Sequence, residues 1–170
     1  MIPSFFQDWV ANQGNRRSQF VLLLFRIANY VHRLPRATRW IGLPYLAFYE
    51  LVVIWILGIE LSYKASVGPA LRLFHGVATV IHQSVIIGRN CTLRHSTTIG
   101  MRKEGEPVPT LGDHVDIGAH SVIMGPIEIG NHVTIGAGSI LLQNVPDCST
   151  VAGNPARILH ISENEKMHQQ

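Results

Sequence analysis

The fold of this protein is decided between residues 81 and 152, where a six-residue pattern begins with IHQSVIIGRNCTLRHSTTIG at 81–100. An aliphatic residue recurs at Ile81, Ile87, Leu93, Ile99, Leu111, Ile117, Ile123, Ile129, Ile135 and Leu141. A second set of small or β-branched residues follows in the same phase, at Val85, Cys91, Thr97, Val115, Ser121, Ile127, Val133, Ser139, Val145 and Val151. A period of six fits neither the 3.6-residue period of a helix nor the alternation of a hairpin strand. It is typical of a hexapeptide β-helix, in which three blocks form a turn of about 18 residues and the aliphatic side chains stack in a column.

The pattern is interrupted between Gly100 and Leu111, where the spacing doubles. Residues 101–109 are rich in charge and contain two prolines, so we expect them to leave the coil as a loop. Loops that project from a rigid scaffold commonly line binding sites. We expect residues 60–80 to form irregular first coils, and the coil to end near Val145-Pro146-Asp147.

The first 58 residues lack the six-residue period and contain many large apolar side chains. Residues 18–34 read as a helix with one apolar face, formed by Phe20, Leu23, Leu24, Ile27, Val31 and Leu34. We therefore divide the chain into an N-terminal helical section, residues 1–58, and a β-helix domain, residues 59–170.

The stretch from Trp40 to Ile59 is apolar except for Glu50 and is long enough to span a bilayer, which takes about 20 residues. Glu50 lies near its centre, where a carboxylate costs about 2.5–3.5 kcal/mol. Three interpretations stay open. The favoured one is a buried helix packed on residues 18–34 or on a neighbouring subunit. The others are a helix lying on a membrane surface, with arginines toward lipid phosphates, and a true span.

Composition excludes several classes of function. The chain has 14 basic and 11 acidic residues, a net charge of +3, and no run of Lys or Arg typical of a nucleic-acid-binding surface. Two cysteines are too few for a disulfide framework, and Cys91 falls on an inward position. The start of the chain lacks the features of a signal peptide. We predict a cytoplasmic protein, with the cytoplasmic face of the membrane as a further possibility.

Residues 60–158 resemble the hexapeptide-repeat acyltransferases, in their serine acetyltransferase-like branch. The similarity is greatest to the acetyltransferases of colanic acid and other exopolysaccharide biosynthesis. The ending Val145-Pro146-Asp147 with 152–157 (AGNPAR) is similar to the closing signature of that family. The resemblance implies a left-handed β-helix, a homotrimer, and acetyl-CoA held between neighbouring coils as co-substrate, without a metal.

The resemblance also implies catalytic residues. Glu60 falls where serine acetyltransferases carry an aspartate, and His75 falls on their catalytic histidine. An imidazole at hydrogen-bond distance is a suitable general base for an alcohol, and a carboxylate would orient it. A buried core histidine is the alternative for His75, because position 75 is in phase with the aliphatic column. His95 is the candidate second histidine, binding the acceptor or the thioester carbonyl.

Further positions match those that meet CoA in the family, and each has a structural alternative. They are Gly118, Ala119, Gly136, Ala137 and Arg157. Gly100 is a candidate for a backbone N–H that stabilises the oxyanion, or is a corner glycine. The remaining histidines of the coil are interpreted as surface or inter-subunit residues; they are His82, His114, His120 and His132.

Two departures from the serine enzymes bear on the substrate. Phe74 replaces an acidic residue before the catalytic histidine, and Val108 replaces a histidine in the protruding loop. Both changes remove polar contacts for a zwitterion, so a sugar hydroxyl in polysaccharide or lipid-linked glycan biosynthesis is the predicted acceptor. A serine O-acetyltransferase and a non-catalytic trimeric scaffold are the alternatives. A zinc enzyme of the γ-carbonic anhydrase kind is disfavoured: two of its three histidine ligands lie about five residues apart, and no two histidines here have a five-residue separation.

Overall fold

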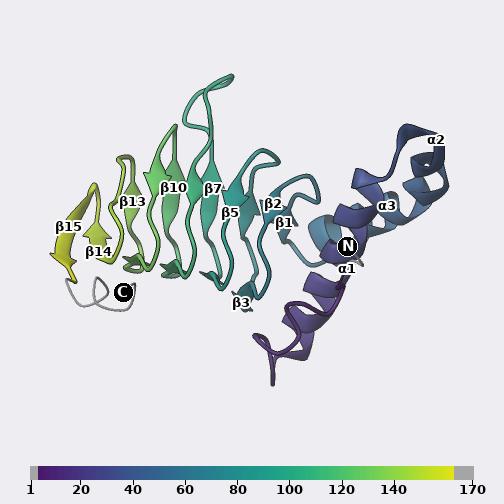
Figure 1. Ribbon diagram of the computed structural model, residues 1–170, viewed down its shortest axis with the longest axis horizontal. Coiled ribbons are helices and arrows are strands. Elements are labelled where there is room, and N and C mark those ends of the chain that lie inside the picture. The colour runs from purple at the N-terminus through teal and green to yellow at the C-terminus, as the bar shows by residue number, and fades with distance from the viewer. Residues whose placement is uncertain (1–3, 163–170) are drawn as a thin grey trace, which may run out of the picture.

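The computed structural model describes residues 4–162, in which a helical section leads into a long coil of short parallel strands (Figure 1). The helices lie at one end of the coil, and strands β14 (Ser149–Gly153) and β15 (Ala156–Ile161) lie at the other. Both parts contribute to one continuous cluster of buried apolar side chains. The helical section therefore packs directly on the coil.

Three parallel sheets form the walls of the coil. Sheet A contains β1 (Glu60–Leu61), β4 (Val80–Ile81), β7 (Thr98–Gly100), β10 (Val122–Met124) and β13 (Ile140–Leu141). Sheet B contains β2 (Ser66–Val67), β5 (Ile86–Ile87), β8 (Thr110–Leu111) and β11 (Glu128–Ile129). Sheet C contains β3 (Arg72–Phe74), β6 (Thr92–Arg94), β9 (Asp116–Ile117), β12 (Thr134–Ile135) and β14, with β15 antiparallel at its end. Because the chain visits A, B and C in rotation, it forms the predicted β-helix.

The interior of the coil consists of the two predicted sets of side chains. Each of the ten aliphatic residues is at most 3% exposed, and each of the ten small or β-branched residues is at most 5% exposed. Burying one such aliphatic side chain contributes roughly 1.5–3 kcal/mol. Burial also raises the pKa of the Cys91 thiol to about 11, in agreement with its predicted place in the core.

Buried hydroxyls at one corner satisfy the backbone where sheet C passes into sheet A. Each donates to a carbonyl three residues earlier: Thr97 to Arg94 at 2.8 Å, Ser121 to Gly118 at 2.8 Å and Ser139 to Gly136 at 2.6 Å. Leaving a buried polar group unbonded costs about 1–3 kcal/mol. These bonds explain why Ser and Thr replace aliphatic residues at this corner.

A ladder of polar side chains holds the corner where sheet B passes into sheet C. Asp113 accepts the Arg89 N–H at 2.9 Å, and Asn131 accepts the Asp113 N–H at 2.8 Å. Asp147 continues the ladder by accepting the Asn131 N–H at 2.8 Å. The backbone bond from Arg89, assisted by its guanidinium 2.8 Å away, holds the pKa of Asp113 below its ordinary value.

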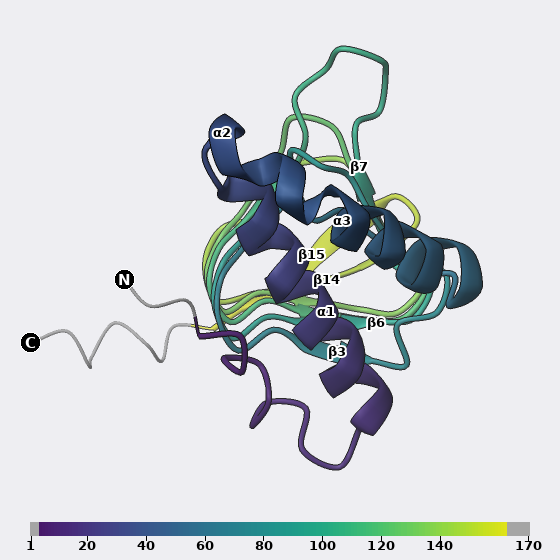
Figure 2. The same ribbon diagram turned by 90° about the vertical axis from the view of Figure 1, so that its right-hand side faces the viewer.

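Residues 101–109, between β7 and β8, leave the coil as predicted, and Figure 2 shows this loop projecting beyond the corner that follows β7. An ion pair between Arg102 and Glu106, with 3.7 Å between Nε and Oε2, spans it. The loop adds six residues to the ordinary six-residue spacing between Ile99 and Leu111. The register of the coil is unchanged, because Ile87 still lies opposite Leu111.

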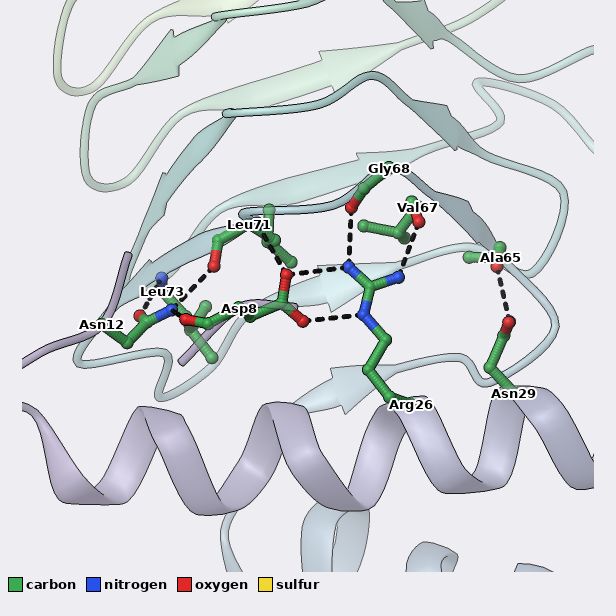
Figure 3. Close-up of polar contacts among 9 residues, drawn as sticks. All are labelled: Asp8, Asn12, Arg26, Asn29, Ala65, Val67, Gly68, Leu71 and Leu73. Atoms are coloured by element: carbon green, nitrogen blue, oxygen red, sulfur yellow. Dashed lines mark hydrogen bonds and ion pairs between the residues drawn. The ribbon is translucent and has the colours of Figure 1, made fainter. Parts of the chain in front are cut away.

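Helix α1 (Arg16–Arg33) crosses the open end of the coil (Figure 2). Side chains from this helix and from the residues before it bond the backbone N–H and C=O groups of the first turn (Figure 3). The Asp8 carboxylate accepts the Leu71 N–H at 2.9 Å, and Asn12 donates to the Leu71 carbonyl at 2.7 Å. Arg26 donates to the carbonyls of Val67 and Gly68, each at 2.6 Å. An edge strand exposes unpaired N–H and C=O groups, and these side chains take the place of a neighbouring strand.

The predicted apolar face of this helix is wrong in part. Phe20 is 48% exposed, and Leu23, Ile27, Val31 and Leu34 are only half-buried. The buried set is Ser18, Gln19, Val21, Leu22, Leu24, Phe25, Arg26 and Ala28. Because the face toward the coil uses polar side chains to bond strand ends, the spacing of apolar residues does not identify it.

A second helical stretch follows without a break from Arg36 to Ile56. It consists of α2 (Arg36–Arg39), a 3-10 turn η1 (Trp40–Gly42), α3 (Leu43–Tyr49) and a π-helical segment η2 (Glu50–Ile56). It packs on α1, and within it only Leu46, Tyr49 and Val53 are buried. The favoured prediction of a buried helix is therefore wrong for the chain by itself. By length and apolar composition this stretch is the one helix in residues 4–162 that could cross a membrane.

Candidate active site

The predicted catalytic histidine lies at the corner between sheets C and A, at the helical end of the coil. Phe74 lies opposite Arg94 in the next turn, so His75 follows at the level of His95. The corner from 75 to 79 has five residues where the next one, 95 to 97, has three. These two extra residues move His75 off the aliphatic column to an exposed position with φ 63°. The alternative of a buried core histidine is therefore excluded.

Three imidazoles line this corner on successive turns. The ring centroids of His75 and His95 are 6.2 Å apart, and those of His95 and His120 are 5.0 Å apart. The backbone fixes the second pair, because the His120 N–H donates to the His95 carbonyl at 3.1 Å. We call His75, His95 and His120 the histidine corner. His75 and His120 are exposed and His95 is half-buried, so the rings can meet a substrate.

Glu60 begins β1 at the same end of the coil, with its side chain exposed. Its backbone N–H donates to the Thr79 carbonyl at 2.8 Å, which places it beside the end of the turn that contains His75. Both residues belong to the described part of the chain, and no hydrogen bond joins their side chains there. Sequence and structure thus bring the two to one corner, and the orienting role of Glu60 stays a prediction.

The ring of Phe74 lies beside that of His75, with 6.5 Å between their centroids. The Arg72 guanidinium lies over the Phe74 ring, with 4.4 Å between Cζ and the centroid, and that of Arg94 lies 5.7 Å away. Arg94 is itself paired with the Asp116 carboxylate. The position that carries an acidic residue in serine acetyltransferases is thus an aromatic ring held between two cations.

Four of the residues predicted to contact CoA lie on the same corner, two on the turn of His120 and two on the next turn. Gly118 and Ala119 follow β9, and Gly136 and Ala137 follow β12, in register with Arg94 and His95 at the end of β6, which lies one and two strands away. Arg157, on β15, lies opposite Ala152 of the neighbouring strand β14. A Cβ on Gly118 would collide with the Ala137 backbone, so glycine is also needed there for packing. The structure brings these positions together without testing their role.

Gly100 and Val108 lie apart from the histidine corner. Gly100 ends β7 at the other edge of sheet A, where a Cβ would meet only the Cβ of His82, at 3.7 Å. Val108 lies in the projecting loop, half-buried against the core. The interpretation of Gly100 as a glycine required by its corner is therefore not supported, and an oxyanion role would need a second chain to bring it to the histidines.

His120 is the residue that sequence reasoning set aside. It lies one residue beyond Ala119, the residue level with His95, so the repeat does not align it with His75 or His95. The backbone bond to His95 and the contact of the two rings bring it into the group. His114 and His132 are exposed as predicted and stack on each other at the opposite corner, with ring centroids 4.5 Å apart. His82 is half-buried beside Gly100.

The histidine corner is an open surface of the single chain. A hollow of about 520 Å³ lies elsewhere, between Thr110 and Asp147 beside sheet B. Within residues 4–162 no group of three or more His, Cys, Asp or Glu side chains is placed to hold a metal ion. A coil that carries histidines on successive turns and small residues on the same corner is the architecture of a hexapeptide acyltransferase.

Comparisons with known proteins agree. Residues 109–143 match the family model "Bacterial transferase hexapeptide (six repeats)". The chain is 35% identical over 157 residues to "Putative colanic acid biosynthesis acetyltransferase WcaB" of Escherichia coli K12, an alignment that covers 89% of this chain and 96% of that protein. The protein therefore belongs to the hexapeptide-repeat acetyltransferases and is an acyltransferase with a left-handed β-helix.

The fold is also similar to solved structures of serine acetyltransferases. The soybean serine acetyltransferase apoenzyme superposes with a TM-score of 0.78 at 26% identity, covering 91% of this chain and 67% of that one. A serine acetyltransferase in complex with CoA gives a TM-score of 0.69 at 27% identity, covering 84% of this chain and 56% of that one.

Proposed function

We propose that the protein transfers an acetyl group from acetyl-CoA to a hydroxyl of a sugar, in a polysaccharide or a lipid-linked glycan. The observation that supports this most directly is the histidine corner, with solvent-accessible imidazoles on three successive turns beside the small residues that match CoA-binding positions. The similarity to WcaB supports the class of acceptor, and the serine acetyltransferase solved with CoA supports the donor.

In the proposed reaction, His75 accepts the proton of the acceptor hydroxyl as its oxygen attacks the thioester carbon. The new C–O bond forms, the C–S bond breaks, and the imidazolium returns the proton to the CoA thiolate. Glu60 would support the imidazolium, and His95 would bind the acceptor or the thioester carbonyl. General-base catalysis of this kind contributes about 10²- to 10⁴-fold to the rate.

The acceptor is inferred from the side chains around Phe74. The ring of Phe74, with the guanidinium groups of Arg72 and Arg94 nearby, offers an apolar surface where the serine enzymes carry a carboxylate. The ammonium group of serine would lose hydrogen bonds to water at this position without gaining a carboxylate partner, and an unbonded polar group costs about 1–3 kcal/mol, or more when it is charged. These features favour a sugar over serine.

Serine O-acetyltransferase is the second candidate. It is favoured by the solved serine acetyltransferases, which superpose over most of this chain. The two candidates differ only in the acceptor, because both use the same donor and the same base.

A homotrimer is part of this proposal, with acetyl-CoA lying between neighbouring coils. It is supported by the open histidine corner and by Gly100, which is remote from the histidines within one chain. A second coil could bring the two together. A location in the cytoplasm is proposed on the composition described above.

The test is thiol release from acetyl-CoA with serine, simple sugars and lipid-linked oligosaccharides as acceptors. We expect turnover with a sugar and little with serine. His75→Ala should lower turnover at least ~10²-fold, whereas the matched variant His114→Ala, on the opposite corner, should not. Turnover unaffected by His75→Ala would place the base elsewhere, and efficient turnover with serine would establish the second candidate.

A further inference from the structure

The stretch Arg36–Ile56, which we call the outer helix, presents an apolar face to solvent. Figure 2 shows α2 and α3 in front, across the end of the coil and outside α1. Trp55 is 81% exposed and Trp40 66% exposed. The other large exposed apolar residues of the stretch are Ile41, Leu43, Phe48, Leu51 and Ile56. The side turned to water is therefore apolar, the reverse of an ordinary surface helix.

The inward side of the outer helix is fixed to the protein. Tyr49 is fully buried and donates to the Leu61 carbonyl at 2.6 Å, and Tyr45 donates to the Leu24 carbonyl at 3.0 Å. Crossing a bilayer would break these contacts and expose the ends of the first strands. The helix is therefore suited to lying along a surface and not to spanning one.

Basic residues outnumber acidic ones in the helical section. Residues 1–58 contain six arginines, no lysine and only two acidic residues, Asp8 and Glu50. Asp8 is buried against Arg26. Glu50 is exposed and lies within reach of Tyr63 of the first coil: burial raises the pKa of that phenol most, and the charge and hydrogen bond of Glu50 raise it further. The cost of burying Glu50, the main objection to lipid contact, does not apply to a carboxylate on the side of the coil.

Basic side chains gather at one end of the same helix. Arg33 and Arg36 are exposed, and Arg39 is half-exposed. Lys64 joins them: burial lowers the pKa of His32 most, and the charges of Arg39, Lys64 and Arg33 lower it further. A cluster that acts together on one imidazole is a compact basic patch.

We propose that the outer helix docks the protein on an anionic lipid surface, with its apolar face in the headgroup region and the basic patch on lipid phosphates. Exposed tryptophans at an apolar–polar boundary and arginines beside them are the side chains that interfacial helices use. A second copy docked on this face by a two-fold axis fits less well, because such a contact would bring two basic patches together. The proposal is independent of the acceptor, and it would hold the active domain beside a membrane.

The test is flotation of the full-length protein with vesicles of phosphatidylcholine alone or with added phosphatidylglycerol. We expect binding that requires the anionic lipid, weakens with salt and shifts the tryptophan emission to the blue. Leu51→Glu with Trp55→Glu should weaken binding at least tenfold, and Arg36→Gln should weaken it about fivefold. These side chains are exposed, so circular dichroism should be unchanged.

The matched control is Leu159→Glu, which alters an equally exposed apolar residue on β15, at the opposite end of the coil. It should bind vesicles like the unaltered protein. The proposal is overturned if anionic vesicles do not bind, or if Leu51→Glu with Trp55→Glu still binds. It is also overturned if those two changes instead dissociate an oligomer that never binds vesicles. Thiol release with a soluble acceptor should be unaffected, so failure of docking and failure of the proposed chemistry are read separately.

Discussion

Removing the Asp8 carboxylate should destabilise the protein strongly, because it leaves a buried cation unpaired. Arg26 donates to both oxygens of Asp8, from Nε at 2.7 Å and Nη2 at 3.0 Å, and the side chains are only 6% and 3% exposed. The carbonyls of Val67 and Gly68 would still hold the guanidinium in place, so it could not turn to water. Breaking such a buried pair costs about 3–5 kcal/mol. The Leu71 N–H would lose its acceptor as well.

Urea unfolding of Asp8→Ala, followed by circular dichroism, measures this loss at constant m. Arg89→Ala is the matched control, because its ion pair with Asp113 has a similar length, 2.8 Å, but side chains 63% and 32% exposed. Exposed pairs contribute about 0.2–1 kcal/mol. The double variant Asp8→Asn with Arg26→Met should lose less than the sum of its single variants, because no charge is left buried. A loss for Asp8→Ala no greater than that for Arg89→Ala would refute the reasoning.

Three other perturbations test the coil and the site. Gly118→Ala should destabilise by about 1–3 kcal/mol in thermal unfolding, because its Cβ meets the next turn, whereas Gly100→Ala has room and should unfold like the parent; equal effects would contradict the packing. His120→Ala should lower kcat/KM without changing stability, and an unaltered kcat/KM would restrict the site to the other two histidines. Asp113→Asn should be less stable than the parent at neutral pH, and the difference should shrink below about pH 4. The reason is that folding lowers the pKa of Asp113. Its charge therefore stabilises the folded protein above the unfolded-state pKa, and this stabilisation is lost as the pH falls through the folded-state pKa. A difference independent of pH would mean that the Asp113 charge contributes nothing.

The six-residue period was sufficient to predict the coil, because every inward side chain of a β-helix meets the same environment one turn later. All twenty predicted inward residues are buried. The loop at 101–109 was predictable for the same reason, as the one place where the repeat fails. Val108, however, packs against the core, which no local pattern indicated.

The helical section shows where patterns fail. Ser18 and Arg26 are buried because the first strands lack a neighbour, and no periodicity of apolar residues marks a helix face that bonds strand ends. For the outer helix the prediction was wrong in the opposite direction. Its apolar residues suggested burial, yet only Leu46, Tyr49 and Val53 find a partner within the chain.

The sequence by itself determined the β-helix, its family and the candidate base, since these depend on repeats and short motifs that are local in the chain. Only the tertiary structure decided that His75 is exposed, that His120 joins it, and that Gly100 lies at a different corner. The physical reason is the strand register. Two residues added to the corner at 75–79 place His75 level with His95, and this alignment becomes visible only when each turn is paired with the next.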